Sequence, residues 1–446
     1  MKKLNYIILI LGLGLIGCKK FLDERSQSSL RIPVTAADFQ SLLDNFSVMN
    51  YRDLSSAELV AGDFYLTDAD WASVSEEERR LYLWETRNVM GLTSNDWIDM
   101  YDMVYRVNTV IEGAKELHAT VNNVDWNNVL GQGYYYRGKC FLQLLGSYAL
   151  AYDDNEEKPG IPLRLDTDFD KKSVRASVKE GYKQVVSDIK KSIGLLPIKP
   201  LHVMRPSKPA GYALLARTYL MMRKYEEAGL YADSCLQLKS DLIDYNSLNL
   251  SLTNPFVMFH PETIHYTRFF NPASISNIRA KINPTIINSY ADGDLRKQAF
   301  YRVSGGAYAQ RGSYSGETIP FGGLATDEIY LIRAESNARA GRLQKALDDL
   351  NTLLKSRWDK NKPFLPYVAS TKEQLLDMVI AERRKELTLR GLRWLDIKRL
   401  NKEGRGISLT RTINGVTYTL PANSARFANP IPERIIEISG MEQNKY

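Results

Sequence analysis

The stretch from Ala381 to Leu400, AERRKELTLRGLRWLDIKRL, combines dense charge with regularly spaced apolar residues. Glu382 and Glu386 lie four positions apart, so a helix places both carboxylates on one face, where they repel each other unless cations lie close. The nearby cations expected to neutralise them are Arg383, Arg390 and Arg393. Gly391 stands where the C-terminal cap of a helix falls, and a second amphipathic turn begins at Trp394. The stretch therefore predicts two helices joined at a glycine.

Two roles are compatible with this lattice of carboxylates and guanidinium groups around a tryptophan. Paired carboxylates can perform acid–base catalysis, whereas structural ion networks lock helices together and shift pKa values without catalysing anything. We favour the structural network, because two carboxylates four residues apart on one helix cannot easily flank a sugar from opposite sides, as glycoside hydrolysis requires. A glycoside hydrolase that uses Glu382 and Glu386 is the distant alternative.

The composition is that of an ordinary globular protein, with 44% hydrophobic and 25% charged residues in a chain of 446. The formal net charge of +7 is mild for this length, and it is not concentrated in a long basic run. Nucleic-acid binding needs such a concentration, so we exclude it. Cys140 and Cys235 each fall inside a helical pattern and are predicted to be small buried residues, which implies no disulfide framework.

The N-terminal segment MKKLNYIILILGLGLIGC has a charged start followed by an apolar run from about Leu4 to Gly17. That run is too short for a comfortable transmembrane helix and fits a signal peptide, which we assign to residues 1–17. It ends in Leu15-Ile16-Gly17-Cys18, which resembles a bacterial lipobox. Acyl chains on Cys18 would anchor the mature protein to a membrane without a spanning helix. The alternative is an ordinary signal peptide in which the cysteine is incidental.

Amphipathic helical patterns dominate the mature chain. The predicted helices cover residues 36–46, 95–117, 129–152, 178–196, 208–222 and 225–238. A repeated pattern places Ala216, Arg223, Tyr225 and Ala228 at the same offsets as Ala334, Gly341, Leu343 and Ala346. Small residues at a close helix approach, with a bulky residue after the turn, are typical of tetratricopeptide pairs. We therefore predict a mainly α fold, with a tetratricopeptide-like scaffold of helical pairs over about residues 95–239 and 327–400.

An irregular, loop-rich insertion is expected at about residues 240–326, between the two parts of the scaffold. It carries Pro, Gly, Asn and Ser punctuation and many aromatic residues, but little helical periodicity. Short strands are predicted there at residues 263–267 and near residues 300–303. A small C-terminal hairpin is predicted around the turn pair Asn414-Gly415, with strands at residues 407–412 and 416–420. Residues 18–446 are expected to form one body.

Two motifs match part of the residue spacing of known binding sites but lack other features that those sites require. Residues 133–140, GYYYRGKC, follow the P-loop spacing until the last position, where Ser or Thr is needed. Three tyrosines inside a helix cannot form a phosphate cradle. His260-Pro-Glu262 has the H-x-E of zinc deaminases, but no C-x-x-C follows it. We predict no nucleotide site, no metal site and no cofactor.

Several motifs, in this order, resemble the SusD/RagB family of Bacteroidetes outer-membrane lipoproteins. Residues 381–400 are similar to the family's E-R-R-x-E-L helix followed by Gly and R-W-x-D-x-x-R. Pro206–Ala232 and Arg333–Leu350 resemble two of its helical segments, and Pro430–Asn444 resembles its closing I-P…Q-N pattern. Lys445 stands where the family often has Pro-Gly, and the insertion is fairly short for the family.

This resemblance implies a cell-surface lipoprotein that caps a SusC-like TonB-dependent outer-membrane transporter and passes it glycans or peptides. It also implies that the protein is not an enzyme and that the N-terminal lipid holds it at the outer membrane, facing the cell exterior.

An oligosaccharide is the favoured ligand, and a peptide in the same role is the alternative. Sugars present flat C–H faces and many hydroxyl groups, so their sites need exposed aromatic rings flanked by polar groups. Residues 62–90 offer Tyr65, Trp71 and Trp84 beside acidic residues, and we predict these three rings as ligand contacts. Core packing competes for each ring, most strongly for Trp84, which ends the apolar run LYLW.

Overall fold

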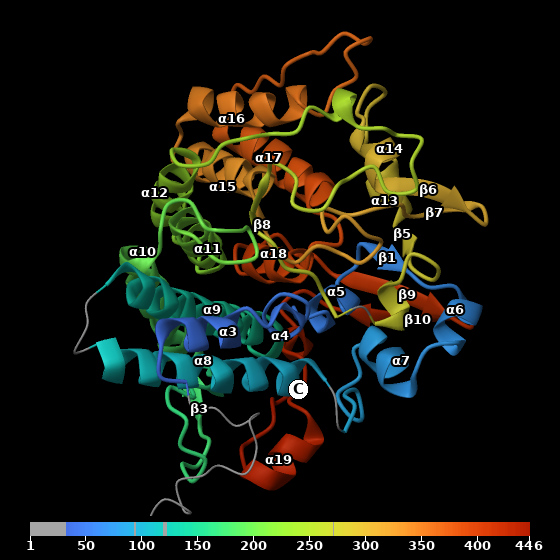
Figure 1. Cartoon of the computed structure of the whole chain (residues 1–446). Helices are drawn as coiled ribbons and strands as arrows, with labels where there is room; N and C mark the ends of the chain where they lie inside the picture. The colour runs from blue at the N-terminus through green and yellow to red at the C-terminus, as the bar shows by residue number, and fades with distance from the viewer. Residues whose placement is uncertain (1–32, 93–94, 119–122, 271) are drawn as a thin grey trace, which may run out of the picture.

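The structure is a computed structural model that describes residues 33–92, 95–118, 123–270 and 272–446. It is mainly helical, and its strands form small two-stranded sheets (Figure 1), so the predicted fold class is confirmed. Within the described residues, no helix is long and apolar enough to cross a membrane. The predicted signal peptide and the predicted lipid-bearing Cys18 lie outside the described residues.

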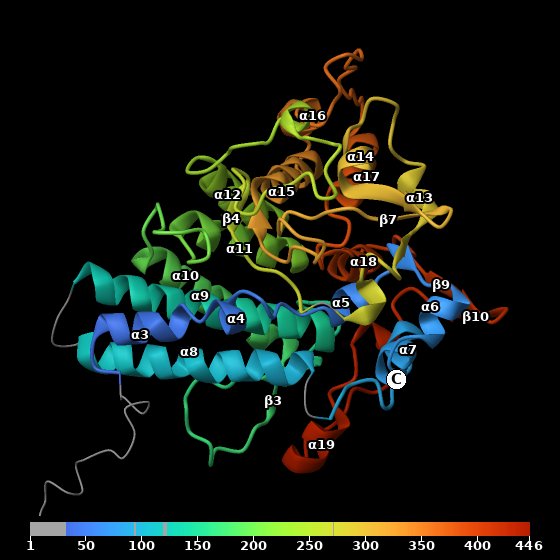
Figure 2. The same ribbon diagram turned by 45° about the vertical axis from the view of Figure 1, so that its right-hand side comes forward.

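Two long neighbouring helices, α8 (Asp96–His118) and α9 (Val124–Tyr148), form the base of the N-terminal half. α9 is buried along most of its length, because α8, α10 (Val178–Leu195) and α3 (Ala36–Leu43) pack against it. Figure 2 shows α3 in front of the seam between α8 and α9. A Cβ at Gly133 would lie 2.9 Å from a side chain of α8, so the glycines of the P-loop-like run serve helix packing.

The repeated pattern marks two helical pairs of the same geometry. The pairs are α11 (Lys208–Met221) with α12 (Tyr225–Leu236), and α15 (Thr326–Arg339) with α16 (Leu343–Lys355). The alanines at equivalent offsets are all fully buried: Ala216, Ala228, Ala334 and Ala346. A left-handed residue follows each first helix at the equivalent position, Arg223 with φ 59° or Gly341 with φ 73°. The predicted tetratricopeptide-like pairing is confirmed.

Two further helices, α17 (Lys372–Glu386) and α18 (Arg393–Asn401), lie on either side of Gly391, as predicted. Gly391 has φ 74°, a conformation that favours glycine and turns the chain between the helices. Trp394 is fully buried and packs on Phe427 with ring centroids 4.6 Å apart. Because α17 also packs against α15, this stretch joins the second helical pair to the C-terminal segment.

Short strands and turns fill the segment between the two helical pairs. β4 (Thr263–His265) pairs with β8 (Leu324–Ala325), and β6 (Tyr301–Ser304) pairs with β7 (Ala307–Gln310), which confirms both predicted strands. The segment also contains α13 (Pro284–Ile287), α14 (Arg296–Phe300) and the 3-10 turns Tyr245–Ser247 and Ala273–Ile275. Many of its aromatic rings form a core cluster of their own, including Tyr245, Phe256, Tyr266, Tyr314 and Phe321.

Short elements lead from α3 to α8 along the side of the molecule that carries the C-terminal hairpin (Figure 1). They are α4 (Phe46–Met49), α5 (Ser56–Leu59), β1 (Phe64–Tyr65), α6 (Asp68–Ala72) and α7 (Glu76–Tyr82). β1 pairs with β5 (Lys281–Ile282), so the segment before α8 meets the segment between the helical pairs.

The C-terminal hairpin consists of β9 (Leu409–Ile413) and β10 (Val416–Leu420), as predicted. Asn414 and Gly415 have φ 50° and 74°, the left-handed pair that a type I′ turn requires. The other elements are β2 (Pro159–Pro162) paired with β3 (Arg175–Ser177), the 3-10 turn Ala425–Phe427 and α19 (Glu433–Ser439). Cys140 and Cys235 are free and buried, as predicted.

Candidate ligand-binding surface

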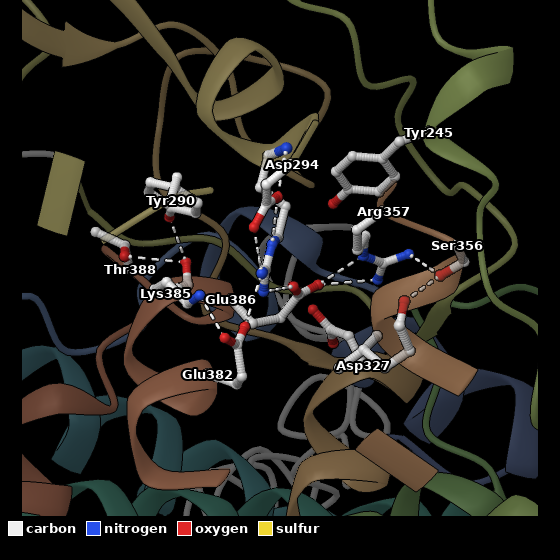
Figure 3. A network of polar contacts seen from close by, with 12 residues as sticks. Tyr245, Tyr290, Asp294, Asp327, Ser356, Arg357, Glu382, Lys385, Glu386 and Thr388 are labelled. Atoms are coloured by element: carbon white, nitrogen blue, oxygen red, sulfur yellow. Dashed lines mark hydrogen bonds and ion pairs between the residues drawn. The ribbon is translucent and has the colours of Figure 1, made fainter. Parts of the chain in front are cut away.

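Glu382 and Glu386 lie in a buried ion network, where they are 1% and 2% exposed (Figure 3). Glu386 accepts hydrogen bonds from Arg357 Nε at 2.9 Å and from Arg296 Nη1 at 3.0 Å. Glu382 accepts from Arg296 Nη2 at 2.7 Å and from the Tyr367 hydroxyl at 2.7 Å. Every oxygen of both carboxylates therefore already accepts a hydrogen bond, most of them charge-assisted.

The electrostatics of this network keep both carboxyl groups ionised. Burial by itself raises the pKa of a carboxyl group. The neighbouring cations outweigh the effect of burial, so the net pKa of both groups is lowered. Arg296 and Lys385 lower the pKa of Glu382, and Arg357 and Arg296 lower the pKa of Glu386. A general acid needs a raised pKa and access to its substrate, and these two glutamates have neither. The glycoside hydrolase alternative thus loses the residues on which it rested.

The three arginines expected to neutralise these glutamates bind other carboxylates, so that prediction is wrong. The observed pairs are Arg383–Asp396 at 2.9 Å, Arg390–Asp327 at 3.1 Å and Arg393–Asp63 at 3.7 Å. Arg383 follows Glu382 directly, and adjacent residues on a helix do not face each other. The other two arginines come after α17 has ended at Glu386, and they leave its axis. Arg296 of α14 and Arg357 after α16 take their place and clamp those segments onto α17.

Tyr65 and Trp71, two of the three predicted ligand contacts, both reach the surface. Trp71 of α6 is partly exposed, and its Nε1 donates to the carbonyl oxygen of Arg79 at 3.3 Å. The Arg79 guanidinium lies 5.6 Å from the Trp71 ring. Tyr65 of β1 is also partly exposed and stands opposite Lys281 in the β1–β5 ladder. Both rings are thus available to a ligand, and their role stays a prediction.

Trp84, the third predicted contact, is a core residue with 3% of its surface exposed. Its Nε1 donates to the carbonyl oxygen of Val60 at 3.0 Å. The guanidinium of Arg411, from the hairpin, lies 4.6 Å from the Trp84 ring and 3.7 Å from the Tyr82 ring. A ring enclosed in this way presents no face to a ligand. The expectation for Trp84 is therefore corrected to core packing beneath the β1–α6 region.

Charged side chains from a distant segment flank Trp71. Lys281 Nζ lies 3.3 Å from Asp70, and Arg279 Nε donates to Ser73 Oγ at 2.9 Å. Together with Arg79, these groups supply both donors and acceptors beside two aromatic rings, which is the combination that sugar hydroxyls and sugar C–H faces require. We call this the β1–α6 surface and define it by Tyr65, Asp70, Trp71, Arg79, Arg279 and Lys281.

A clamp from α7 fixes the segment that brings Arg279 and Lys281 to this surface. The Glu78 carboxylate accepts the backbone N–H groups of Ala273 at 3.2 Å and Ser274 at 2.7 Å. A surface held by side-chain bonds to backbone groups loses less conformational entropy on binding than a free loop. Sequence reasoning missed Arg79, Arg279 and Lys281, because the β1–β5 pairing joins residues that are far apart in the chain.

The fold is that of a scaffold built from helical pairs, with a partly exposed aromatic surface on one side. Two family models match the sequence. One, described as starch-binding and associating with the outer membrane, matches residues 20–220, and one described as the SusD family matches residues 283–443. The chain therefore belongs to the SusD family, as its motifs predict. No curated protein matches it.

Solved structures share this fold over nearly the whole chain. A SusD superfamily protein from Bacteroides thetaiotaomicron is 19% identical, with a TM-score of 0.75 over 93% of this chain and 100% of that one. A SusD-like carbohydrate binding protein from Bacteroides vulgatus is 18% identical, with a TM-score of 0.68 over 91% and 96%. Another SusD superfamily protein from Bacteroides vulgatus is 19% identical, with a TM-score of 0.73 over 92% and 98%. At these identities the likeness concerns the fold.

Proposed function

We propose that this chain is a non-enzymatic lipoprotein, anchored through Cys18 to the outer membrane, that binds an oligosaccharide on the outside of the cell. It passes the oligosaccharide to a SusC-like TonB-dependent transporter. The family description as starch-binding and the carbohydrate-binding relative with the same fold support the ligand class. The lipobox-like segment that ends at Cys18 supports the anchor.

The β1–α6 surface is the observation that carries the choice of ligand. Trp71 and Tyr65 leave part of each ring exposed, although burying a whole aromatic side chain would remove more apolar area from water. Around Trp71, the Asp70 carboxylate accepts hydrogen bonds and the Arg279 and Lys281 cations donate them. A sugar ring laid on Trp71 would therefore find partners for its hydroxyl groups without any movement of the backbone.

Two tryptophans of this segment provide a matched test. We expect Trp71→Ala to weaken oligosaccharide binding about tenfold, the effect of roughly 1.4 kcal/mol, while the melting temperature stays within a few degrees. Trp84→Ala removes a core ring and should lower the free energy of unfolding by about 3–5 kcal/mol. Calorimetric titration of the mature protein with malto-, cello-, xylo- and manno-hexasaccharides measures binding.

Three outcomes of this titration contradict parts of the proposal. If no hexasaccharide binds the wild-type protein while a tryptic peptide mixture does, the ligand is a peptide. If Trp71→Ala costs several kcal/mol of stability and leaves affinity unchanged, Trp71 is a core residue like Trp84. If Lys281→Met and Trp71→Ala both bind as the wild type does, the β1–α6 surface is not the site.

The proposed transporter partner needs a separate experiment. Mild detergent extraction of the outer membrane, followed by affinity purification of the tagged protein, should recover a large TonB-dependent barrel protein in a stable ratio. The matched control is the same protein carrying Cys18→Ala, which lacks the anchor. Recovery of the tagged protein alone, under conditions that keep other outer-membrane complexes intact, would argue against this partner.

A further inference from the structure

A hollow lies on a different part of the molecule from the β1–α6 surface, since none of the residues that define that surface lines it. A groove of about 820 Å³ runs between α8, the loop from β2 to β3, and α19. Figures 1 and 2 both show β3 and α19 on the same side of α8. The groove continues into a hollow of about 460 Å³, and the two share Lys172, Ser173 and the stretch from Ser439 to Met441. Its volume falls within the usual range of ligand sites.

Two aromatic rings stand exposed at this groove. Phe169 is 78% exposed and Tyr105 is 39% exposed. Their ring centroids lie 4.8 Å apart with an interplanar angle of 37°, so each ring supports the other and leaves an outer face bare. A large aromatic residue usually gains several kcal/mol by burial, so a phenylalanine left in water in this way calls for a partner.

The loop that carries Phe169 is fastened to α8 by buried and half-buried polar groups. The Asn108 amide, which is fully buried, donates to the carbonyl oxygens of Arg164 at 3.0 Å and Asp166 at 3.1 Å. The Glu112 carboxylate accepts the Thr167 N–H at 3.0 Å and the Thr167 hydroxyl at 2.6 Å. These bonds hold Arg164, Asp166 and Thr167 in place just before Phe169, so Phe169 has a defined position.

The same loop is also braced from within. Arg164 donates to the carbonyl oxygen of Lys171 at 2.5 Å and to Ser173 Oγ at 3.3 Å, and it also donates to the carbonyl oxygen of Asp168. One guanidinium thus ties together both sides of the loop around Phe169. Because the loop is already ordered, a ligand that lands on the ring has little loop entropy to remove.

The rest of the groove combines apolar walls with charged rims. Tyr101 lines it, with its hydroxyl donating to the carbonyl oxygen of Pro162 at 2.7 Å. Ile438 of α19 lines it from the other side and is 69% exposed. Lys172 and Glu437 also line the groove. Among the described residues the Lys172 ammonium makes no ion pair, whereas Glu437 pairs with Arg434 at the surface at 3.2 Å. A ligand in the groove therefore meets apolar side chains together with one hydrogen-bond donor, the Lys172 ammonium, and one acceptor, the Glu437 carboxylate.

We propose that this groove is a second carbohydrate site, in which one sugar ring stacks on the exposed face of Phe169, which Tyr105 supports from behind, and its hydroxyl groups bond to Lys172 and Glu437. The proposal rests on the proposed function, since it assigns the same ligand class to a second place on the chain. A rigid, bare aromatic face favours a sugar, because a sugar ring is flat and covers the face while its hydroxyl groups reach both rims.

The number of binding events tests this proposal. Titration of the mature protein with the hexasaccharide that binds the wild type should show about two equivalents per chain. Phe169→Ala should weaken one event about tenfold and leave the other, with the melting temperature unchanged because the ring is exposed. Phe169→Tyr keeps the aromatic face and should keep both events. Leu365→Ala, at a similarly exposed apolar residue in the loop before α17, is the matched control and should also keep both.

The outcomes separate this inference from the proposed function. A single binding event, lost in Trp71→Ala and unchanged in Phe169→Ala, overturns the second site and leaves the proposed function standing. No binding of any hexasaccharide to the wild type overturns both. If a tryptic peptide mixture binds the wild type and not Phe169→Ala, while glycan binding is the same in both, the groove takes peptides and the carbohydrate assignment is wrong.

Glu112→Gln tests how the loop is positioned, because it loosens the loop without changing the Phe169 ring. A loss of affinity in the binding event that Phe169→Ala weakens, smaller than the loss in Phe169→Ala, supports the proposed positioning.

Discussion

Replacing Glu386 with glutamine tests whether the buried ion network is structural. Both oxygens of Glu386 accept from guanidinium groups, Arg357 Nε at 2.9 Å and Arg296 Nη1 at 3.0 Å. In Glu386→Gln the amide NH₂ group would face one of these donors, and the negative charge between two fully buried cations would be gone. The substitution keeps the size of the side chain, so packing stays the same and the electrostatic effect is isolated.

The magnitude follows from the two bonds that are damaged. Hydrogen bonds to charged groups contribute about 1.5–3 kcal/mol each, and breaking a buried ion pair costs about 3–5 kcal/mol, because the remaining charge is left uncompensated. Arg296 retains Asp294 and Glu382, and Arg357 retains Glu262, which limits the damage. We expect Glu386→Gln to lower the free energy of unfolding by about 3–5 kcal/mol.

Urea denaturation followed by tryptophan fluorescence measures this loss. Glu226→Gln is the matched control, since Glu226 pairs with Arg342 at the surface at 3.2 Å, and it should change stability by less than about 0.5 kcal/mol. Oligosaccharide affinity, measured where both proteins are folded, should be equal in Glu386→Gln and the wild type. A loss of affinity at full stability would show that the network belongs to a binding or catalytic site, and would refute the structural interpretation.

Two further predictions concern the anchor and the pH dependence of stability. Cys18→Ala should move the protein from the membrane fraction to the soluble periplasmic fraction, and unchanged fractionation would contradict the lipid anchor. Burial, with the Asp63 charge nearby, raises the pKa of Glu58 to about 8. The folded state therefore holds a proton that the unfolded chain, with a carboxyl pKa of about 4.3, has already released. The contribution of Glu58 to stability is full below a pH of about 4.3, the pKa in the unfolded chain, and is lost as the pH rises toward 8, the pKa in the folded state. Glu58→Gln should remove this slope in urea midpoints measured from pH 5 to 9, and identical slopes in both proteins would refute it.

The parts of the fold that depend on local patterns could be predicted from the sequence. Ala216 and Ala334 sit where backbones must approach closely, and the spacing to the next alanine fixes the helical pair before any tertiary contact is known. Asn414-Gly415 specifies its hairpin for a similar reason, since few other pairs adopt two left-handed residues in succession. In both cases the physical requirement lies within about a dozen residues of chain.

The ion pairs could not be predicted in this way. Glu386 has four arginines within seven residues, and none of them is its partner. Its partners Arg296 and Arg357 lie 90 and 29 positions away, and only the packing of α14 and α16 on α17 brings them close. A carboxylate accepts from any guanidinium in reach, so the charge pattern predicts that a network exists but does not say which residues form it.

The same limit applies to the aromatic residues. The apolar run LYLW favours core packing for Trp84, whereas Trp71 stands among acidic and small residues. The sequence could not show that Trp84 is enclosed by Arg411 from the hairpin, which lies more than 300 residues further along the chain. Phe169 is a single aromatic residue in a polar loop, and such a sequence does not by itself predict a ligand contact. Only the fold brings Phe169 into one groove with Asn108 and residues of α19.

The two proposed carbohydrate sites are supported by different charged side chains, so damage to the support of one site need not affect the other. The Phe169 loop is tied to α9 through Arg137, which donates to the Asn108 amide oxygen at 3.0 Å and to the Leu165 carbonyl oxygen at 3.2 Å. Asp188 of α10 holds that guanidinium with two bonds of 2.8 Å. The segment that carries Arg279 and Lys281 is held instead by Glu78 of α7, whose carboxylate accepts the backbone N–H groups of Ala273 at 3.2 Å and Ser274 at 2.7 Å. Proteins open locally in cooperative units, so damage to one of these supports should impair one site and spare the other.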